Sequence, residues 1–153
     1  MAYNHLEIEK KWLVNIDTAP INLSDYSYLM IEQAYLNTHP VVRIRRSNDE
    51  YYLTYKGSGM MKRAEYNLPL NKESYEHMLP KADGKVLSKN RYLIPFGKYT
   101  IELDEFLKDY KGLYLAEVEF DSETEADSFI PPIWFGKEVT NEKKYHNSNM
   151  IFG

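Results

Sequence analysis

The chain contains no cysteine among its 153 residues. This absence excludes a disulfide framework, a thiolate nucleophile and a zinc finger. No run approaches 18 apolar residues, and the N-terminus lacks the charged-then-apolar order of a signal peptide. We therefore expect a single domain over residues 1–153, in the cytoplasm and without a membrane partner.

Histidine pairs at metal-binding spacing are also missing, and positive charge is not in excess. The four histidines stand far apart in the sequence, so we expect them at the surface. A formal net charge of −4 argues against nucleic acid as a partner. A basic stripe within an acidic protein would instead suit a small anion. No motif for self-association is present, so a monomer and a homodimer are both compatible with the sequence.

The first strand-like segment, residues 5–12, alternates charged and apolar side chains. Glu7, Glu9 and Lys11 occupy every second position, and a β-strand would place them on one face. Neighbouring carboxylates repel each other unless a cation lies between them, and oxygen ligands suit Mg²⁺ or Mn²⁺. An ordinary half-buried antiparallel strand shows the same alternation, so this segment alone leaves both interpretations open.

The same alternation recurs along the chain, and the charges are sorted by sign. Arg43 and Arg45 form a basic row, whereas Glu117 and Glu119 form an acidic row. Like charges opposite one another destabilise a sheet, so these rows indicate a ligand of mixed charge. In a metal–polyphosphate complex, carboxylates would bind the metal and Arg or Lys the phosphate oxygens. The alternating segments after the first are residues 42–45, 52–56, 63–68, 89–91, 101–104 and 116–120.

Two arrangements satisfy this pattern. In a closed barrel the charged rows could face inward and line a water-filled tunnel, with the apolar rows beneath covering helices. In an open sheet the apolar face would pack on helices and the charged face would simply be hydrated. The pattern does not decide between them. Fourteen tyrosines favour strands, and short helices are predicted at residues 72–79 and 123–129, with a third helical turn after Thr140.

Several ordered segments resemble a known family. Residues 7–11 match the ExExK signature of the CYTH superfamily, the triphosphate tunnel metalloenzymes. The resemblance implies an α+β, mainly β fold: an eight-stranded antiparallel β-barrel with a few short covering helices. The tail is similar to that of the short bacterial inorganic triphosphatase-like members. The other matching segments are residues 33–36, 42–45, 54–57, 63–66, 89–92, 102–106, 116–120, 130–140 and 143–145.

The resemblance also implies roles for individual residues. Lys11, Arg43 and Glu65 would be catalytic, with Glu65 orienting the basic side chains. Asn67 departs from the family, which often has a second Glu at this place. The implied metal ligands are Glu7, Glu9, Glu117 and Glu119, with Glu102 and Asp104 as further ligands or supporting acids. The implied triphosphate-binding residues are Lys11, Arg43, Arg45, Lys56 and Arg91, then Arg63 and Lys89, and Lys144 closing over the tunnel mouth.

The activity implied by the resemblance is metal-dependent hydrolysis of inorganic triphosphate to pyrophosphate and phosphate, with Mg²⁺ or Mn²⁺ as cofactor. Three alternatives stay open: a class IV adenylate cyclase, another organic triphosphatase such as thiamine triphosphatase, and a non-catalytic polyphosphate-binding module. For Lys11 we expect one of two roles. As a neutral amine it could accept a proton from the attacking water, or it could form an ion pair with Glu7 or Glu9.

Overall fold

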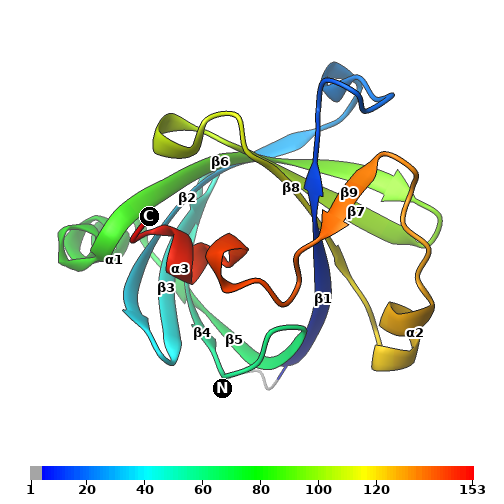
Figure 1. Ribbon diagram of the computed structural model, residues 1–153. Coiled ribbons are helices and arrows are strands. Elements are labelled where there is room, and N and C mark those ends of the chain that lie inside the picture. Colours follow the sequence, from blue (N-terminus) through cyan, green and yellow to red (C-terminus); the bar gives the residue numbers. More distant parts are fainter. Residues whose placement is uncertain (1–4) are drawn as a thin grey trace.

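The computed structural model describes residues 5–153, which form a closed antiparallel β-barrel (Figure 1). Within these residues the sheet order is β5-β4-β3-β2-β6-β7-β8-β1, and β1 closes the barrel by pairing with β5. A short further strand, β9, pairs with β1 in antiparallel fashion outside the barrel. This confirms the expected eight-stranded barrel. The strands are β1 His5–Val14, β2 Tyr28–Thr38, β3 Val41–Ser47, β4 Glu50–Lys56, β5 Lys62–Leu70, β6 Asp83–Phe96, β7 Tyr99–Phe106, β8 Tyr114–Glu119 and β9 Phe135–Glu138.

The helices are short, and the first two α-helices begin at the residues that the sequence predicts, Lys72 and Glu123. The Asn71 side chain accepts a hydrogen bond from the Ser74 amide at the start of α1, and Ser122 does the same for Glu125 at the start of α2. Within the described residues, no helix is long and apolar enough to cross a membrane. The α-helices are α1 Lys72–Met78, α2 Glu123–Ser128 and α3 Asn147–Met150, and the 3-10 helices are Leu23–Asp25, Leu79–Lys81, Lys108–Tyr110 and Lys143–Tyr145.

The charged rows face the barrel interior, and the apolar rows face outward beneath covering segments. Ile44, which alternates with the arginines of β3, is buried on the outside against Tyr75 of α1. Trp12 of β1 packs beneath Phe135, with ring centroids 4.9 Å apart, and Trp134 adds to the same cluster. Of the two arrangements that the sequence left open, the closed barrel with an inward charged lining is therefore the correct one.

One end of the barrel is filled by apolar side chains. They point inward from β2, β3, β6, β7 and β8, and the segment after β9 crosses the barrel to complete the cluster (Figure 1, red). Each of these side chains is at most 5% exposed. We call this cluster the floor of the barrel: Tyr35, Val41, Leu87, Phe106, Leu115, Val139, Met150 and Ile151.

Candidate active site

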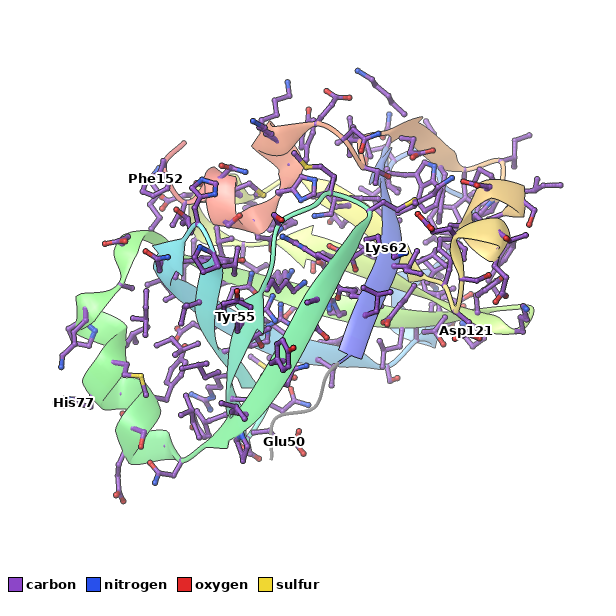
Figure 2. The ribbon with its side chains drawn as sticks, turned by 90° about the horizontal axis from the view of Figure 1, so that it is seen from below. Glu50, Tyr55, Lys62, His77, Asp121 and Phe152 are labelled. Atoms are coloured by element: carbon purple, nitrogen blue, oxygen red, sulfur yellow. The ribbon has the colours of Figure 1, made fainter. Side chains whose placement is uncertain are left out.

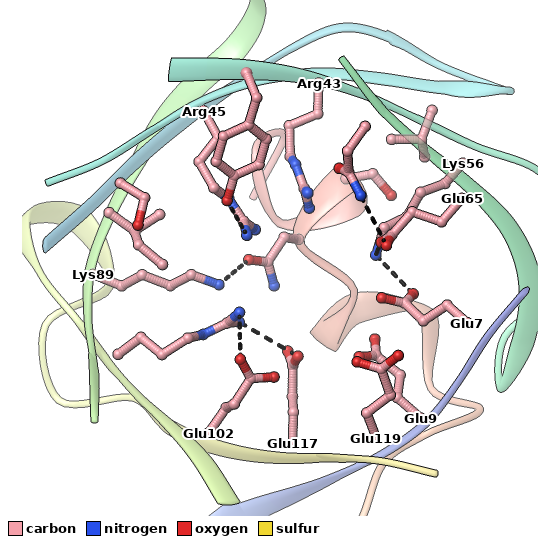
Figure 3. Close-up of a pocket in the computed structure, with 18 of the residues that line it drawn as sticks. Glu7, Glu9, Arg43, Arg45, Lys56, Glu65, Lys89, Glu102, Glu117 and Glu119 are labelled. Atoms are coloured by element: carbon pink, nitrogen blue, oxygen red, sulfur yellow. Dashed lines mark hydrogen bonds and ion pairs between the residues drawn. The ribbon is translucent and has the colours of Figure 1, made fainter. Parts of the chain in front are cut away.

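Beyond the floor, the barrel interior forms a polar cavity of about 370 Å³ (Figure 3). Most of the residues that we predicted for the site line this cavity. Asp104 and Lys144 are not part of the lining. The basic lining residues are Lys11, Arg43, Arg45, Lys56, Arg63, Lys89 and Arg91, and the acidic ones are Glu7, Glu9, Glu65, Glu102, Glu117 and Glu119.

Strand register gathers many of the acids on the wall formed by β1, β7 and β8. Glu9 lies opposite Glu119 in the β1–β8 pair, and Glu102 lies opposite Glu117 in the β7–β8 pair. Side chains directly opposite each other in neighbouring strands point to the same face. The register therefore places these four carboxylates together, and Figure 3 shows Glu9 beside Glu119.

Burial and the neighbouring carboxylates raise the pKa of Glu9. Loss of hydration raises it from 4.5 to about 8, and repulsion from Glu117 and Glu7 adds to the rise. Within residues 5–153, no group of three or more acidic or histidine side chains forms a ready-made metal cage. The acidic wall thus offers carboxylate pairs, which a cation would relieve of their repulsion.

The pKa of Glu117 is shifted in the opposite direction to that of Glu9. Burial alone would raise its pKa, but Lys11 and Arg91 hold the pKa well below its ordinary value. Lys11 Nζ lies 3.4 Å from Glu117 Oε1, and Arg91 Nη2 lies 3.4 Å from Glu117 Oε2. The Lys11 ammonium also donates to the Tyr145 carbonyl, at 3.0 Å. The ionic partner of Lys11 is therefore Glu117, and the predicted pairing with Glu7 or Glu9 is wrong.

A buried ionic cluster lies at the edge of the basic wall, the name used here for the cavity-lining cations Arg43, Arg45, Lys56, Lys89 and Arg91. Asp104 is fully buried. Its Oδ2 lies 2.7 Å from Lys89 Nζ, and its Oδ1 lies 2.8 Å from Arg91 Nε. Burial would raise the pKa of Asp104, but these two cations lower it. Burial also lowers the pKa of Lys89 to about 7, although Asp104 opposes that shift. Asp104 thus lies behind the cavity and holds two of its basic residues in place.

Arg45 and Arg43 project from β3 with different sets of partners. Gln33 Oε1 accepts from Arg45 Nε at 2.9 Å and from Arg45 Nη2 at 2.6 Å, so this guanidinium is fixed. Arg43 Nη2 donates to Thr54 Oγ1 at 3.1 Å. Its Nε is buried and makes no hydrogen bond to any of the described residues. A buried charged donor without a partner favours an anionic ligand at this point.

A third cluster links β1, β4 and β5. Lys56 Nζ lies 2.8 Å from Glu7 Oε1 and 3.4 Å from Glu65 Oε2 (Figure 3). Burial opposes ionisation of Glu65, but Lys56 lowers its pKa below the ordinary value. Asn67, where the resemblance led us to expect a second Glu, donates to Glu65 Oε1 at 3.1 Å and accepts from Thr54 at 2.6 Å. A neutral amide can make both bonds at once, whereas a carboxylate could not donate to Glu65.

The C-terminal segment supplies polar contacts that the sequence pattern did not identify. Asn147 lines the cavity, and its Oδ1 accepts from Lys89 Nζ and from Gln33 Nε2, each at 2.9 Å. Lys144 is exposed, with Nζ 5.0 Å from the Tyr145 ring centroid. Asn147 belongs to no alternating row, so periodicity gave no signal for it. Gln33 was visible as the first residue of a family-like segment.

His146 differs from the expected surface position. Only 6% of the residue is exposed, and its Nε2 lies 2.7 Å from the Thr140 carbonyl. Burial lowers the pKa of His146, and the nearby charge of Lys11 adds to this effect. His39 and His77 are exposed as expected, whereas the side chain of His5 lies outside the described part of the structure.

A closed barrel with opposed acidic and basic walls is an architecture for a small, highly charged ligand. The chain belongs to the CYTH domain family, whose model matches residues 5–146. This confirms the resemblance drawn from the ExExK signature and the ordered segments.

Two curated relatives are both named inorganic triphosphatase. The protein from Nitrosomonas europaea is 38% identical over 146 residues, which is 92% of this chain and 93% of the relative. The protein from Acetivibrio thermocellus is 36% identical over 150 residues, which is 95% of this chain and 92% of the relative.

Solved structures agree with the barrel. The crystal structure of an inorganic triphosphatase superimposes with a TM-score of 0.70 at 34% identity, covering 96% of this chain and 95% of that chain. A protein from Pyrococcus horikoshii shares the fold, with a TM-score of 0.59 at 18% identity over 79% of this chain and 83% of its own.

Proposed function

We propose that this protein hydrolyses inorganic triphosphate to pyrophosphate and phosphate with the help of a divalent metal ion. The observation that carries the proposal is the sorting of charge inside one cavity, with a basic wall facing an acidic wall. The names of the two curated relatives support the same activity. A metal–triphosphate complex has the matching charges, since its phosphate oxygens suit the cations and its metal suits the carboxylates.

The basic wall would bind the triphosphate and stabilise the transition state. A triphosphate carries about four negative charges at neutral pH, which oppose attack by water, so positioned cations lower the barrier. The buried Nε of Arg43 is available to donate to a phosphate oxygen, and Gln33 already orients the Arg45 guanidinium. Asp104 orients Lys89 and Arg91 from behind, and Glu65 orients Lys56. We therefore assign binding to the cations and positioning to these two acids.

The acidic wall fits Mg²⁺ or Mn²⁺. Mg²⁺ is commonly held by one or two carboxylates together with substrate phosphates, so it does not need a preformed cage of protein ligands. Glu9 and Glu119, opposite each other in the β1–β8 register, are the donors that we assign first, with Glu117 and Glu102 beside them. When bound, the metal would neutralise phosphoryl oxygens and make a bound water more acidic.

Lys11 is better suited to a charged role than to that of a base. Its ammonium lies beside the Glu117 carboxylate and donates to the Tyr145 carbonyl, so two of its N–H groups already have partners. The third ammonium hydrogen is available for a phosphate oxygen. We infer that Lys11 binds and orients the triphosphate as a cation.

The direct test is phosphate release from tripolyphosphate, with ATP in parallel, in the presence of Mg²⁺, Mn²⁺ or EDTA. We expect metal-dependent release that strongly favours tripolyphosphate and stops with EDTA. Cyclic AMP and pyrophosphate from ATP would assign a cyclase instead. Inactivity on both substrates, with binding retained, would identify a polyphosphate-binding module.

Replacing Arg43 by alanine should lower kcat/KM for tripolyphosphate by about 10²- to 10³-fold, because one preorganised donor is lost. The fold should survive, since the partner of Arg43 is the neutral Thr54 hydroxyl, which keeps its bond to Asn67. Arg46→Ala is the matched control, because Arg46 is an arginine of the same strand, three residues further on, and is exposed on the outer face. Equal hydrolysis by Arg43→Ala and Arg46→Ala would contradict the assignment.

Asn147→Ala should also lower kcat/KM, by about 10- to 100-fold, although Asn147 carries no charge. The change removes an acceptor shared by Lys89 and Gln33, and misplacement of catalytic groups by about 1 Å can cost this much. Asn149→Ala in the same short helix is the control, and thermal unfolding of both variants checks the fold. A normal rate for Asn147→Ala in a folded protein would show that Lys89 needs no such support.

A further inference from the structure

We propose that Gln33 of β2 is a positioning residue that sets the affinity of the cavity for polyanions, because it orients the Arg45 guanidinium without neutralising its charge. This inference rests on the proposed function and deepens it, since it assigns the selection of highly charged anions to an uncharged side chain. Gln33 is fully buried and is not part of the cavity lining, so it would act only through the residues that it contacts (Figure 2 shows the side chains within the barrel).

Both ends of the Gln33 amide are occupied. Gln33 lies directly opposite Arg45 in the β2–β3 register, and its Oε1 accepts from Arg45 Nε at 2.9 Å and from Arg45 Nη2 at 2.6 Å. Its Nε2 donates to the Tyr35 hydroxyl at 3.0 Å and to Asn147 Oδ1 at 2.9 Å. A guanidinium only donates hydrogen bonds, so the oxygen of the amide has to face Arg45. Gln33 therefore joins Arg45 to the C-terminal segment in one fixed orientation.

The other three cations of the basic wall are paired with carboxylates. Lys89 and Arg91 contact Asp104, and Lys56 Nζ lies 2.8 Å from Glu7 Oε1. Burial alone would lower the pKa of Arg91, but Asp104 holds this pKa well above its ordinary value. Much of the positive charge of these three side chains is thus balanced before any ligand enters the cavity.

Arg43 and Arg45 have neutral partners instead. Within the described part of the chain, their side chains donate to Thr54, Gln33 and Tyr52, and neither arginine forms an ion pair. Burial lowers the pKa of Arg45, and repulsion from Arg43 adds to this shift. Figure 3 shows both arginines across the cavity from the acidic wall. The pair therefore carries uncompensated positive charge, which a polyanion would balance.

The neutrality of the Gln33 amide is what preserves this charge. A carboxylate at position 33 could accept both N–H groups of Arg45, so the guanidinium would keep its orientation but would already be paired. An entering polyanion would then be repelled by a fixed negative charge. An apolar side chain would leave the charge of Arg45 free but would remove the acceptor that orients it. An amide provides both the orientation and the free charge.

The test compares Gln33→Glu and Gln33→Met with the native protein. Affinity for a methylene-bridged analogue of tripolyphosphate, which is not hydrolysed, is measured by titration calorimetry with Mg²⁺, beside thermal unfolding of the ligand-free proteins. Asn147→Ala is the control for the lost hydrogen bond, because it removes a contact of Gln33 without adding charge. Asn37→Asp is the charge control, because it adds one negative charge at the exposed end of the same strand.

We expect Gln33→Glu to bind the analogue about 100-fold more weakly than the native protein, and Gln33→Met only about tenfold more weakly. Thermal unfolding should give the reverse order, with Gln33→Glu the more stable of the two, because it keeps an acceptor for the buried guanidinium. Asn37→Asp should bind like the native protein, and Asn147→Ala should lose less affinity than Gln33→Glu. A merely structural role would make affinity follow stability and could not give these opposite orders.

Two results would overturn the inference. One is native-like affinity of Gln33→Glu, and the other is a loss of affinity that parallels the loss of stability in the two Gln33 variants. Arg45→Met provides a second test that does not depend on the folding of Gln33→Glu. It removes the charge that Gln33 preserves, so it should weaken binding by about 100-fold or more, and native-like binding by this variant would also overturn the inference.

The hydrolysis assay separates this inference from the proposed function. Hydrolysis of tripolyphosphate by the native protein, together with native-like affinity of Gln33→Glu, would keep the function and reject the role of Gln33. Affinity that depends on the charge at position 33, without hydrolysis by the native protein, would keep the role of Gln33 and reject the catalytic assignment. Failure of the native protein to bind the analogue would reject both.

Discussion

Replacing Glu9 by glutamine is expected to abolish tripolyphosphate hydrolysis and, at the same time, to stabilise the metal-free protein. The loss of activity should reach about 10³-fold, because metal assistance contributes several kcal/mol to such reactions. The gain in stability follows from the burial of the Glu9 carboxylate and from its repulsion by Glu117 and Glu7, both of which cost less for a neutral glutamine. A residue that costs stability but is needed for activity is typical of a functional site.

The stabilisation expected from Glu9→Gln depends on pH. Because the pKa of Glu9 is raised from 4.5 to about 8, the native protein keeps a proton there that the unfolded chain releases. The contribution of this group to stability therefore falls as the pH rises from 4.5 towards 8, and Glu9→Gln removes that loss. We expect the variant to gain about 1–3 kcal/mol in the free energy of unfolding at pH 8 without metal.

Thermal and urea unfolding with and without Mg²⁺, beside phosphate release, measure both effects. Mg²⁺ should stabilise the native protein more than the variant, because the metal relieves the same repulsion. Glu76→Gln is the control, since Glu76 is an exposed helix residue outside the barrel. A variant that is active with Mg²⁺, or one destabilised without it, would contradict the metal-binding role of Glu9.

Asp104→Asn is expected to produce the opposite result, a large loss of stability. The fully buried carboxylate is paired with Lys89 and Arg91, and its removal leaves two buried cations without their main partner. Breaking a buried ion pair by removing one partner costs about 3–5 kcal/mol. Activity should fall as well, because both cations line the cavity and would lose their fixed positions.

The difference between the native protein and Asp104→Asn should depend on pH. The pKa of Asp104 is lowered below 3.8, so its stabilising contribution is present above pH 3.8 and is lost as the pH falls through the lowered value. Urea unfolding at neutral pH and in acid would measure this change, with Asp109→Asn as the exposed control. A neutral effect at pH 7 would show that the cations are held by their other contacts.

Glu9 and Asp104 have different surroundings, although the sequence pattern predicts the same role for both. Glu9 and Asp104 both occupy alternate positions in charged strands, and both were assigned to the metal. Glu9 lines the cavity among other carboxylates, whereas Asp104 is enclosed by cations behind it. Parity along a strand places a residue on a face but does not say which neighbouring strands contribute its partners.

Much of the interior lining was nevertheless predictable. The rows that begin with Glu7, Arg43 and Glu117 turn inward together, as expected if the sheet closes. The short helices at α1 and α2 were also predictable, because the caps at Asn71 and Ser122 are local hydrogen bonds.

Local periodicity and motif order were enough to predict which residues share a face, where the first two helices begin and which family the chain resembles. The three-dimensional packing established that the charged face turns inward, that Glu117 pairs with Lys11, and that Asn147 reaches Lys89. It also decided that the C-terminal segment closes one end of the barrel. Each of these depends on contacts between residues far apart in the chain, for which a period of two carries no information.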